Sequence, residues 1–499
     1  MNKKYTLWGL GSVLIVLVGL FCFSQRSSVE LVILHTNDHH GYCWSIENKG
    51  GLAKQYTVVQ QVRQKNKNVL LLSAGDINTG YPESDVNQAE PSFKGMRLMG
   101  FDAIAVGNHE FDVSLSLLRQ QQIWGGFPFL SANIYKKNSQ QRLFTPYIIK
   151  KLDSLRIAIV GLTTEETAYI AKFIEDIEFR DPIEEMKRLM PALKQQADLI
   201  IALTHMGYDA DPSHGGLGTT DLQLAEANPQ INVIVGGHSH TLLSEPVRVG
   251  QTLILQAYQY AKNMGELHLT INRLKKKIVK IAYQMHDIDE KIPESKEILT
   301  LLNPYLARAK VLFDQKVGRT NVYLDGKREH VRSQETNLGN LITDLFRKMT
   351  KAEVAIQNGG GIRAPIAKGI ISFRDIRKSF PFDNTIVVLT LSGRELLEIL
   401  NRSASLTRPA GGFLQVSGIS FEIHKNHVRN VRVNKKPLIL DRVYSVATND
   451  FIAKGGDGYT LFKGKPYSDT GFAISGVLKN YISLRKTISP KVEGRIIIR

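Results

Sequence analysis

Cysteine is almost absent from this sequence, with only Cys22 and Cys43 among 499 residues. Cys22 lies inside an N-terminal apolar run, so removal of that run would leave one thiol and no internal disulfide. We therefore expect a fold stabilised by its hydrophobic cores rather than by cross-links. For the same reason, a metal site in this chain would have oxygen and nitrogen ligands in place of thiolates.

Other features are also missing. The chain has no low-complexity tract and no internal repeat, which argues against disordered and solenoid proteins. Its formal net charge of +17 is high, and a basic surface attracts nucleic acids, anionic membranes and small anions alike. However, no run of five or more Lys or Arg occurs, and aromatic and basic residues are not interleaved. The charge alone therefore indicates no specific nucleic acid partner.

The N-terminal segment has the order of an export signal, because Lys3 and Lys4 precede the uncharged apolar residues 7–23. The length of this run lies between that of a signal-peptide core and that of a membrane-spanning helix. We expect export to the periplasm, with residues 1–28 acting either as a cleaved signal peptide or as an anchor in the inner membrane. Residues 494–499 carry no hydrophobic tail, so we expect no lipid anchor at that end.

The length predicts two large domains. Up to about residue 260, short runs rich in Val, Ile and Leu alternate with longer amphipathic stretches; the runs are 31–34, 69–73, 103–107, 157–161, 199–203 and 231–237. Continuous apolar runs of this length are typical of strands buried on both faces of an α/β layered domain. The stretches 114–123 and 182–196 have the apolar spacing of helices.

The composition then changes. Residues 261–286 predict a strand hairpin, and residues 292–311 predict one polar helix suited to connect two domains. From about residue 317 onward, a helix at 336–350 and strands at 353–357, 385–391 and 418–424 are mixed with Gly-rich loops.

Potential metal ligands follow five of the predicted strands. The residues at these strand ends are Asp38 and His40, Asp76, Asn108 and His109, His205, and His238 and His240. In open α/β sheets, ligands gather beyond the carboxyl ends of the strands. Each of these residues taken singly is more often a turn, cap or surface residue, but five strand ends of this kind in one domain predict a metal centre.

The residue types favour a pair of divalent ions that clamp a phosphoryl group. Asp76 would bridge the ions, and the O and N ligands favour Zn²⁺ or Mn²⁺, with Co²⁺ and other divalent ions as alternatives. His109 would act as a general acid or stabilise phosphoryl charge, and Asp112, three residues later, would hold its tautomer. We interpret His35, His39 and Cys43 as bystanders.

These segments resemble the 5′-nucleotidase family, with HTNDHHG (35–41), GDINTG (75–80), GNHEFD (107–112), THMG (204–207) and GGHSH (236–240) similar to its metallophosphoesterase domain. ETNLGN (335–340), NGGGIR (358–363), PF (381–382) and NDFIAKGGDGY (449–459) look like its nucleotide-binding domain. The resemblance covers essentially the whole chain after the N-terminal segment, and it is closest to the periplasmic UDP-sugar hydrolases and 5′-nucleotidases of bacteria.

The resemblance implies roles for individual residues. One ion would be held by Asp38, His40, Asp76 and His240, and the other by Asp76, Asn108, His205 and His238. His109 and Asp112 would form the catalytic pair, with a metal-bound water as the nucleophile. Some relatives carry Gln or Asn at the position of His240, and because imidazole is a competent ligand we expect activity to be retained.

The resemblance also implies how substrate is bound and how the chain is divided. Phe382 and Phe451 would stack on the base, Asn358 would contact it, and Asp457 would bind the ribose hydroxyls. Arg332 and Arg363 would meet the phosphate or its neighbours. We expect an α/β fold with an α+β second domain. A four-layer metallophosphoesterase sandwich (29–290) would be joined by a linker helix (291–316), near which the domains would rotate, to a C-terminal substrate-binding domain (317–499). We expect a monomer.

Three alternatives remain open at this stage. The same architecture serves 2′,3′-cyclic nucleotide phosphodiesterases with 3′-nucleotidase activity. A non-catalytic nucleotide-binding surface protein would have lost ligand residues, but all of the expected ligands and both residues of the catalytic pair are present. A nucleic acid binder would depend on charge alone and would require strong binding at physiological salt.

Overall fold

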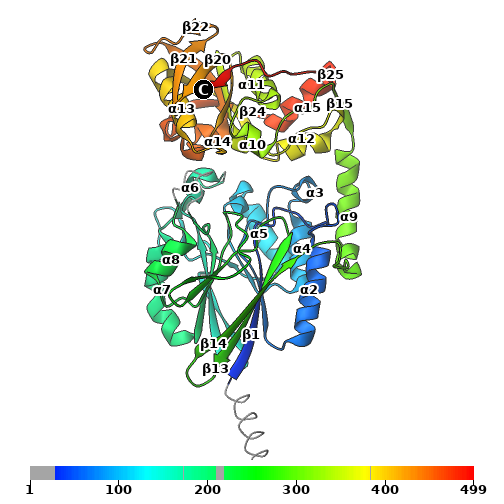
Figure 1. Ribbon diagram of the computed structural model, residues 1–499, viewed down its shortest axis with the longest axis vertical. Helices are drawn as coiled ribbons and strands as arrows, with labels where there is room; N and C mark the ends of the chain where they lie inside the picture. Colours follow the sequence, from blue (N-terminus) through cyan, green and yellow to red (C-terminus); the bar gives the residue numbers. More distant parts are fainter. Residues whose placement is uncertain (1–27, 172, 210–217, 383) are drawn as a thin grey trace, which may run out of the picture.

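The computed structural model describes residues 28–499 except 172, 210–217 and 383. The export segment predicted at residues 7–23 lies outside this range. Two lobes are visible in Figure 1: an N-terminal lobe from β1 to β14, coloured blue to green, and a C-terminal lobe from β15 to β26, coloured green to red. In the described part of the chain, no helix has both the length and the apolar character needed to cross a membrane.

The N-terminal lobe alternates strands and helices along the chain. Its elements are β1 (Ser28–Thr36), α2 (Leu52–Lys65), β2 (Val69–Ser73), α3 (Pro82–Asp85), α4 (Glu90–Met99), β3 (Ala103–Ala105), the 3-10 helix η1 (His109–Asp112), α5 (Leu115–Gly125), β4 (Phe129–Leu130), β5 (Ile134–Lys136), β6 (Tyr147–Leu152), β7 (Leu155–Thr163), α6 (Thr167–Ile170), β8 (Ile177–Phe179), α7 (Pro182–Gln196), β9 (Leu199–His205), α8 (Asp221–Ala227), β10 (Val233–Val235), β11 (Val247–Val249), β12 (Thr252–Leu255), β13 (Asn263–Asn272) and β14 (Lys277–Asp287).

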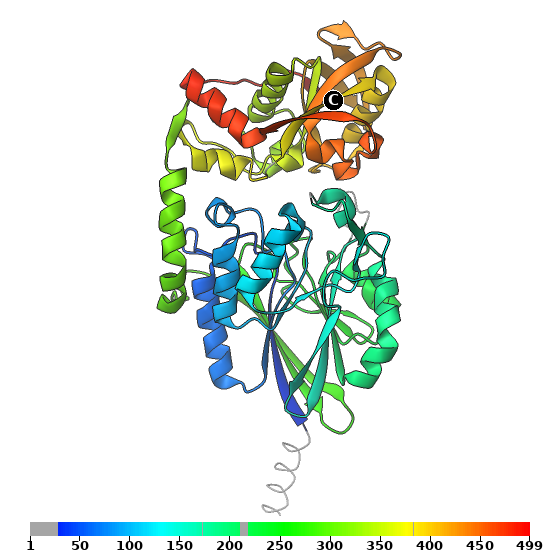
Figure 2. The ribbon, with the colours of Figure 1, turned by 180° about the vertical axis from the view of Figure 1, so that it is seen from behind.

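Two six-stranded sheets form the centre of this lobe, in the orders β14-β13-β1-β2-β3-β4 and β11-β12-β10-β9-β7-β6. Alternate residues of β1 face opposite sides: Leu31 and Ile33 join the core between the sheets, whereas Val32 and Leu34 join the core shared with α2, α4 and α9. On the far side, α7 and α8 cover the second sheet through a core that includes Met186. Helix, sheet, sheet and helix make the four layers that the resemblance implied, as Figures 1 and 2 show.

The C-terminal lobe mixes sheets and helices. Its elements are β15 (Lys316–Thr320), α10 (Arg328–Val331), α11 (Asn337–Thr350), β16 (Val354–Asn358), the 3-10 helix η2 (Gly359–Gly361), β17 (Gly369–Ser372), α12 (Phe373–Ser379), β18 (Thr385–Ser392), α13 (Gly393–Ser405), β19 (Leu414–Ser417), β20 (Ile419–His424), β21 (His427–Val433), β22 (Lys436–Pro437), β23 (Val443–Asn449), α14 (Asp450–Ala453), the 3-10 helices η3 (Gly456–Gly458) and η4 (Thr460–Phe462), β24 (Tyr467–Ala473), α15 (Ile474–Arg485), β25 (Thr487–Ile488) and β26 (Ile496–Ile498). Its sheets have the orders β19-β16-β23-β18-β24, β22-β21-β20-β26 and β17-β15-β25.

A single long helix, α9 (Lys296–Phe313), lies between the lobes along the chain. It packs on α2 and α4 of the N-terminal lobe through Ile298 and Leu302, and Figure 2 shows it running along one side of the molecule up to β15. The sequence predicted this helix from residue 292. It begins four residues later because the preceding chain is bonded to α2 instead: the Thr57 hydroxyl donates to the Pro293 carbonyl, and the Ser295 amide to the Ala53 carbonyl.

Candidate active site

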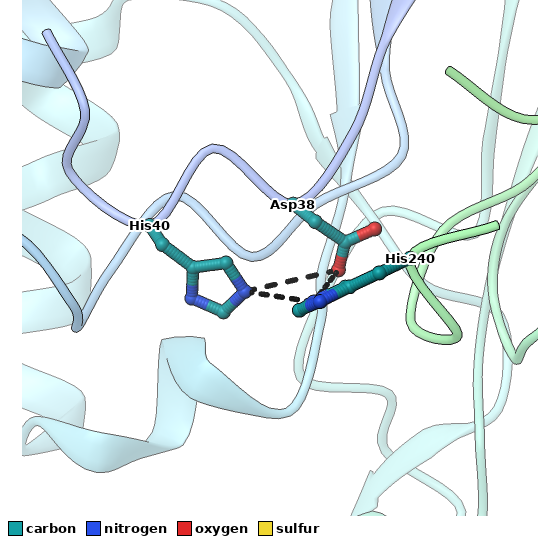
Figure 3. A group of neighbouring side chains, drawn as sticks. All are labelled: Asp38, His40 and His240. Carbon is teal, nitrogen blue, oxygen red and sulfur yellow. Dashed lines mark hydrogen bonds and ion pairs between the residues drawn. The ribbon is translucent and has the colours of Figure 1, made fainter. Parts of the chain in front are cut away.

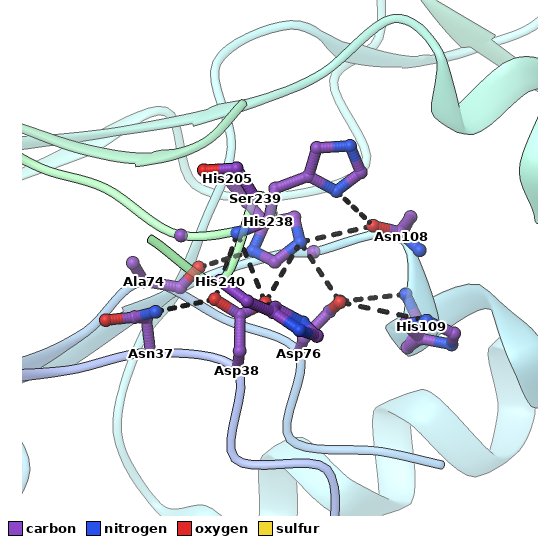
Figure 4. Close-up of polar contacts among 12 residues, drawn as sticks. Asn37, Asp38, Ala74, Asp76, Asn108, His109, His205, His238, Ser239 and His240 are labelled. Carbon is purple, nitrogen blue, oxygen red and sulfur yellow. Dashed lines mark hydrogen bonds and ion pairs between the residues drawn. The ribbon is translucent and has the colours of Figure 1, made fainter. Parts of the chain in front are cut away.

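The candidate metal ligands lie together at one edge of the two central sheets. Strands β1, β2 and β3 run parallel to one another, and β9 runs parallel to β10. Their carboxyl ends therefore point the same way, and the turns beyond them place all seven predicted ligand residues and His109 in one cluster. Figure 4 labels every member of this cluster except His40 and shows the labelled side chains converging from both sheets.

On one side of the cluster, Asp38 lies between two imidazoles. Its Oδ1 is 3.3 Å from Nε2 of His240 and 4.0 Å from Nε2 of His40. The two imidazole Nε2 atoms are 3.1 Å apart. Figure 3 shows the three side chains pointing toward a common centre, and their donor atoms are close enough to bind one ion.

On the other side, Asp76 occupies the middle of the cluster. Its Oδ2 lies 3.1 Å from Nε2 of His205, 3.9 Å from that of His40 and 4.0 Å from that of His109. The Asn108 Oδ1 is 3.1 Å from the same His205 nitrogen and 2.9 Å from Nδ1 of His238. Asp76 thus lies near His40 on the Asp38 side of the cluster and near His205 on the other side. A carboxylate that bridges two ions requires this position.

The hydrogen bonds behind two of these histidines fix their tautomers. Nδ1 of His205 donates to the Ala74 carbonyl at 2.7 Å, and Nδ1 of His40 donates to the Thr79 carbonyl at 2.8 Å. Because a carbonyl can only accept, Nε2 of each ring faces the carboxylates and is available as a ligand atom. This tautomer control, together with the O and N donor set, fits a pair of divalent cations.

Burial and charge set the protonation of these groups. Burial by itself would raise the pKa of Asp38, but His240 and His205 outweigh it and lower that pKa to about 2. Burial lowers the pKa of His205, yet Asp76 and Asp38 raise it to about 10. The pKa of Asp76 is also lowered, chiefly by His205 and His109, so both carboxylates are ionised although they are buried. Their negative charges require nearby positive charge, which protonated His205 contributes and which divalent cations would supply more fully.

The backbone at the ligands is held in an uncommon conformation. Asp38, His40, Asp76, His238 and His240 have φ between 49° and 84°. Left-handed backbone at non-glycine residues costs on the order of 1–3 kcal/mol each and gathers at functional sites. The strained backbone at these five residues therefore indicates that the direction of their side chains is important for function.

One buried carboxylate that the sequence reasoning missed supports these turns. Glu110 is buried and accepts hydrogen bonds from the backbone amides of Asp76 at 3.0 Å, Ile77 at 2.8 Å and Gly107 at 2.7 Å. It thereby joins the turn after β2 to the turn after β3. Its position inside GNHEFD was visible, but its direction away from the ligands was not.

The catalytic pair predicted from the sequence is in contact. Nδ1 of His109 lies 2.6 Å from Oδ2 of Asp112 on η1. Burial lowers the pKa of His109, but Asp112 and Asp76 outweigh it and raise that pKa to about 9. The ring also belongs to a group with His40 and Asp76 whose spacing would suit a metal, so the geometry allows His109 a ligand role in addition to the predicted one.

The predicted bystanders lie outside the ligand groups that the described residues form. His35 is buried, with its Nε2 3.2 Å from the Tyr283 hydroxyl. His39 is buried without a hydrogen-bond partner on its ring nitrogens. Cys43 is buried with its Sγ 2.9 Å from the Ser92 hydroxyl, so among the described residues no thiol faces the cluster.

A cavity next to the cluster lies between the lobes. Asn108, His109 and Asp112 line it from the N-terminal lobe. From the C-terminal lobe it is lined by all six predicted substrate residues: Arg332, Asn358, Arg363, Phe382, Phe451 and Asp457. The Phe382 ring stacks over that of His109 at 6.1 Å, which brings the aromatic pocket to the edge of the candidate metal site.

The Gly-rich loops of this cavity have packing roles. A Cβ at Gly456 would lie 2.5 Å from the Phe451 ring, so the glycine lets that ring lie flat against the loop. The Asn358 side-chain amide donates to Asp457 at 2.7 Å and so orients its carboxylate. Arg377, Asn384 and Lys454 also line the cavity and were missed, because no pattern in the sequence places them beside Phe382 and Phe451.

Fold and site together define a metallophosphoesterase with a cavity between its two lobes. Residues 31–242 match the family model described as calcineurin-like phosphoesterase, and residues 316–464 match that of the 5′-nucleotidase C-terminal domain. The chain belongs to the 5′-nucleotidase family. It is a hydrolase that acts on nucleotides, and its family implies divalent metal ions.

Full-length relatives agree with this assignment. The chain is 37% identical to "Protein UshA" of Escherichia coli (strain K12), with 92% of each chain covered. It is 39% identical to "5'-nucleotidase" of Vibrio cholerae, covering 92% of this chain and 91% of that one. Among solved structures, the 5′-nucleotidase precursor from Thermus thermophilus has a TM-score of 0.79 at 32% identity, over 94% of this chain and 99% of that one.

Proposed function

We propose that this enzyme releases phosphate from nucleoside 5′-monophosphates and other 5′-nucleotides, and cleaves UDP-sugars to UMP and sugar 1-phosphate, with two divalent ions. The observation that carries the proposal is the shared cavity. Residues suited to a base, a ribose and a phosphate line it opposite His109 and Asp112, beside the Asp38 and Asp76 clusters.

We assign Asp38, His40, Asp76 and His240 to one ion, and Asp76, Asn108, His205 and His238 to the other. The donor set favours Zn²⁺ or Mn²⁺, with Co²⁺ as a further candidate. Ions bound here would act as Lewis acids on the phosphoryl oxygens and lower the pKa of a coordinated water. The chain itself contributes ligand direction, because carbonyls hold the His40 and His205 rings.

His109, oriented by Asp112, donates a proton to the departing oxygen. Asp112 accepts from Nδ1 of His109, which leaves Nε2 to carry the proton that the departing oxygen needs. Because Asp112 holds the ring by its far nitrogen, Nε2 remains directed at the cluster, 4.0 Å from Asp76.

The C-terminal lobe holds the nucleoside. Phe382 and Phe451 stack on the base, and stacking accepts every base because each has a π face. Asp457, oriented by Asn358, binds the ribose hydroxyls, and Asn358 lies close enough to the cavity to meet the base. Arg332 and Arg363 neutralise the phosphate.

The chain organisation is proposed as follows. The catalytic domain spans 29–290, the linker helix 291–316 and the substrate-binding domain 317–499, with rotation between domains near the linker. Residues 1–28 export the protein to the periplasm, either as a cleaved signal or as an anchor. We propose that the enzyme acts as a monomer.

The test is phosphate release from AMP, UDP-glucose and 2′,3′-cyclic AMP by metal-stripped protein, with and without Zn²⁺, Mn²⁺ or Co²⁺. We expect metal-dependent turnover of AMP and UDP-glucose, and a loss of about 10²–10⁴-fold in kcat for His109→Ala. Turnover of the cyclic nucleotide but not of AMP would favour the phosphodiesterase alternative. Nucleotide binding without turnover of any of the three would favour a binding protein.

A further inference from the structure

A second cavity shares His109 with the nucleotide cavity, but its lining does not include Phe451. It measures about 460 Å³, within the ~300–1,000 Å³ typical of small-molecule sites. It shares Thr79, His109, Arg363, Pro381 and Phe382 with the nucleotide cavity and also reaches His40. The two cavities therefore meet beside the candidate metal site, and one extended substrate could occupy both.

Three tyrosines form an aromatic wall in this second cavity. The Tyr42 and Tyr260 rings stack with centroids 4.3 Å apart, and Tyr81 lies 5.1 Å from Tyr42. All three are half-buried, and within the described residues none of their hydroxyls has a hydrogen-bond partner. A half-buried phenol offers an apolar face and a polar group at once, which suits a ligand that has both.

The rim of this cavity is basic. Lys49, Lys262 and Lys378 line it and are exposed, and Arg363 lies deeper, next to Phe382. Among the residues that the structure describes, none of these four cations forms an ion pair. Glu47 is the one acidic residue in the lining, so the cavity is suited to an anion.

We propose that this cavity binds the sugar 1-phosphate half of a nucleotide sugar while the nucleoside half occupies the Phe382–Phe451 cavity. The proposal rests on the proposed function and assigns a subsite to it. Hydrolysis breaks one P–O bond of the diphosphate: water gives its hydroxyl to one phosphorus and a proton to the departing oxygen. UMP and sugar 1-phosphate are then left in the two cavities.

The chemistry of the lining fits this half-substrate. A pyranose has an apolar C–H face that packs on a tyrosine ring and hydroxyls that bond to phenol oxygens, while the lysines neutralise the phosphate. A nucleoside monophosphate has nothing to place here, so the cavity should matter for UDP-glucose more than for AMP.

The test compares the full-length protein with Tyr42→Ala, Tyr42→Phe and Lys378→Ala, using Lys368→Ala as a matched exposed control outside the cavity. We expect the ratio of kcat/KM for UDP-glucose to that for AMP to fall about tenfold in Tyr42→Ala and Lys378→Ala, with a smaller fall in Tyr42→Phe, as expected for loss of one stacked or charge-assisted contact. An unchanged ratio in all three variants would overturn the proposal.

A second measurement separates this inference from the proposed function. Glucose 1-phosphate should inhibit AMP hydrolysis at least tenfold more tightly than inorganic phosphate, and Tyr42→Ala should remove that difference. If the wild-type enzyme hydrolyses AMP but not UDP-glucose, the UDP-sugar part of the proposed function fails, and this inhibition still decides the subsite. Equal inhibition by the two anions in the wild type would overturn it.

Discussion

The guanidinium of Arg374 on α12 forms an ion pair with the carboxylate of Glu83 on α3, and so links the C-terminal lobe to the N-terminal lobe. Glu83 is fully buried. Arg374 also contacts Asp314 at 2.9 Å, just past the end of α9, and lies over the Phe313 ring. A single arginine thus connects both lobes with the C-terminal end of the helix between them.

This contact should be important for stability. Arg374→Ala leaves Glu83 buried without its cation, so we expect a loss of about 3–5 kcal/mol in the free energy of unfolding. Arg394→Ala removes an ion pair with Asp441 in which both side chains are exposed, and should cost about 0–1 kcal/mol. Urea unfolding measures the loss in the free energy of unfolding for each variant. Equal losses in the two variants would show that the Glu83 ion pair contributes no more to stability than an exposed one.

Asp112 should determine the pH above which turnover falls, because it helps to raise the pKa of His109. A protonated His109 is the form that donates a proton, so kcat/KM should fall as pH rises through the pKa of His109. Asp112→Asn removes one of the charges that raise this pKa, and the alkaline limb should move to lower pH by about one unit or more. An alkaline limb at the wild-type pH in Asp112→Asn would contradict the role of the pair.

Gly107 should be essential although it has no side chain to contact a metal or substrate. A Cβ there would lie 2.2 Å from Oδ1 of Asp76, so Gly107→Ala must displace the carboxylate proposed to bridge the ions. We expect the variant to lose bound metal and its kcat for AMP to fall about 10²-fold or more, since misplacing a catalytic group by about 1 Å costs this much. Its circular dichroism spectrum should stay native. Gly476→Ala, where an added Cβ meets nothing within 4 Å, is the matched control.

Aromatic stacking should set affinity for every base. Phe451→Ala removes one face of the proposed clamp, so KM should rise about 5–150-fold for AMP, UMP and GMP alike, in line with about 1–3 kcal/mol per stacked base. Phe472→Ala replaces an exposed ring outside the cavity and should leave all three KM values within twofold. A rise for one base only would indicate that hydrogen bonding, not stacking, selects the substrate.

Much of the catalytic lobe could be predicted because its strands are buried on both faces. The run at 69–73 is observed as β2 with the same bounds, and the helix predicted at 182–196 is observed as α7. Helix α7 is clear in the sequence because Asp181 caps it, accepting from the amides of Ile183 and Glu184, and Pro182 follows at the first turn. The metal cluster followed from the parallel strand order, which brings the ligand-bearing strand ends to one edge.

Other features depend on contacts between distant segments. Glu110 lies beside His109 in the sequence, yet its side chain turns away to accept the amides behind Asp76. The Glu83–Arg374 pair joins residues almost three hundred positions apart. The aromatic wall of Tyr42, Tyr81 and Tyr260 comes from three separate loops, and only the folded chain brings these rings together.

The most direct test of the two-ion site is the metal content of the purified protein, measured beside its activity. After dialysis against Zn²⁺ or Mn²⁺ and removal of free ions, the wild type should retain two ions per chain, and Asp76→Asn should retain at most one and lose AMP turnover. That result would support Asp76 as the bridge between the Asp38 and His205 sides of the cluster. A single ion in the wild type, or two ions with full activity in Asp76→Asn, would contradict the account.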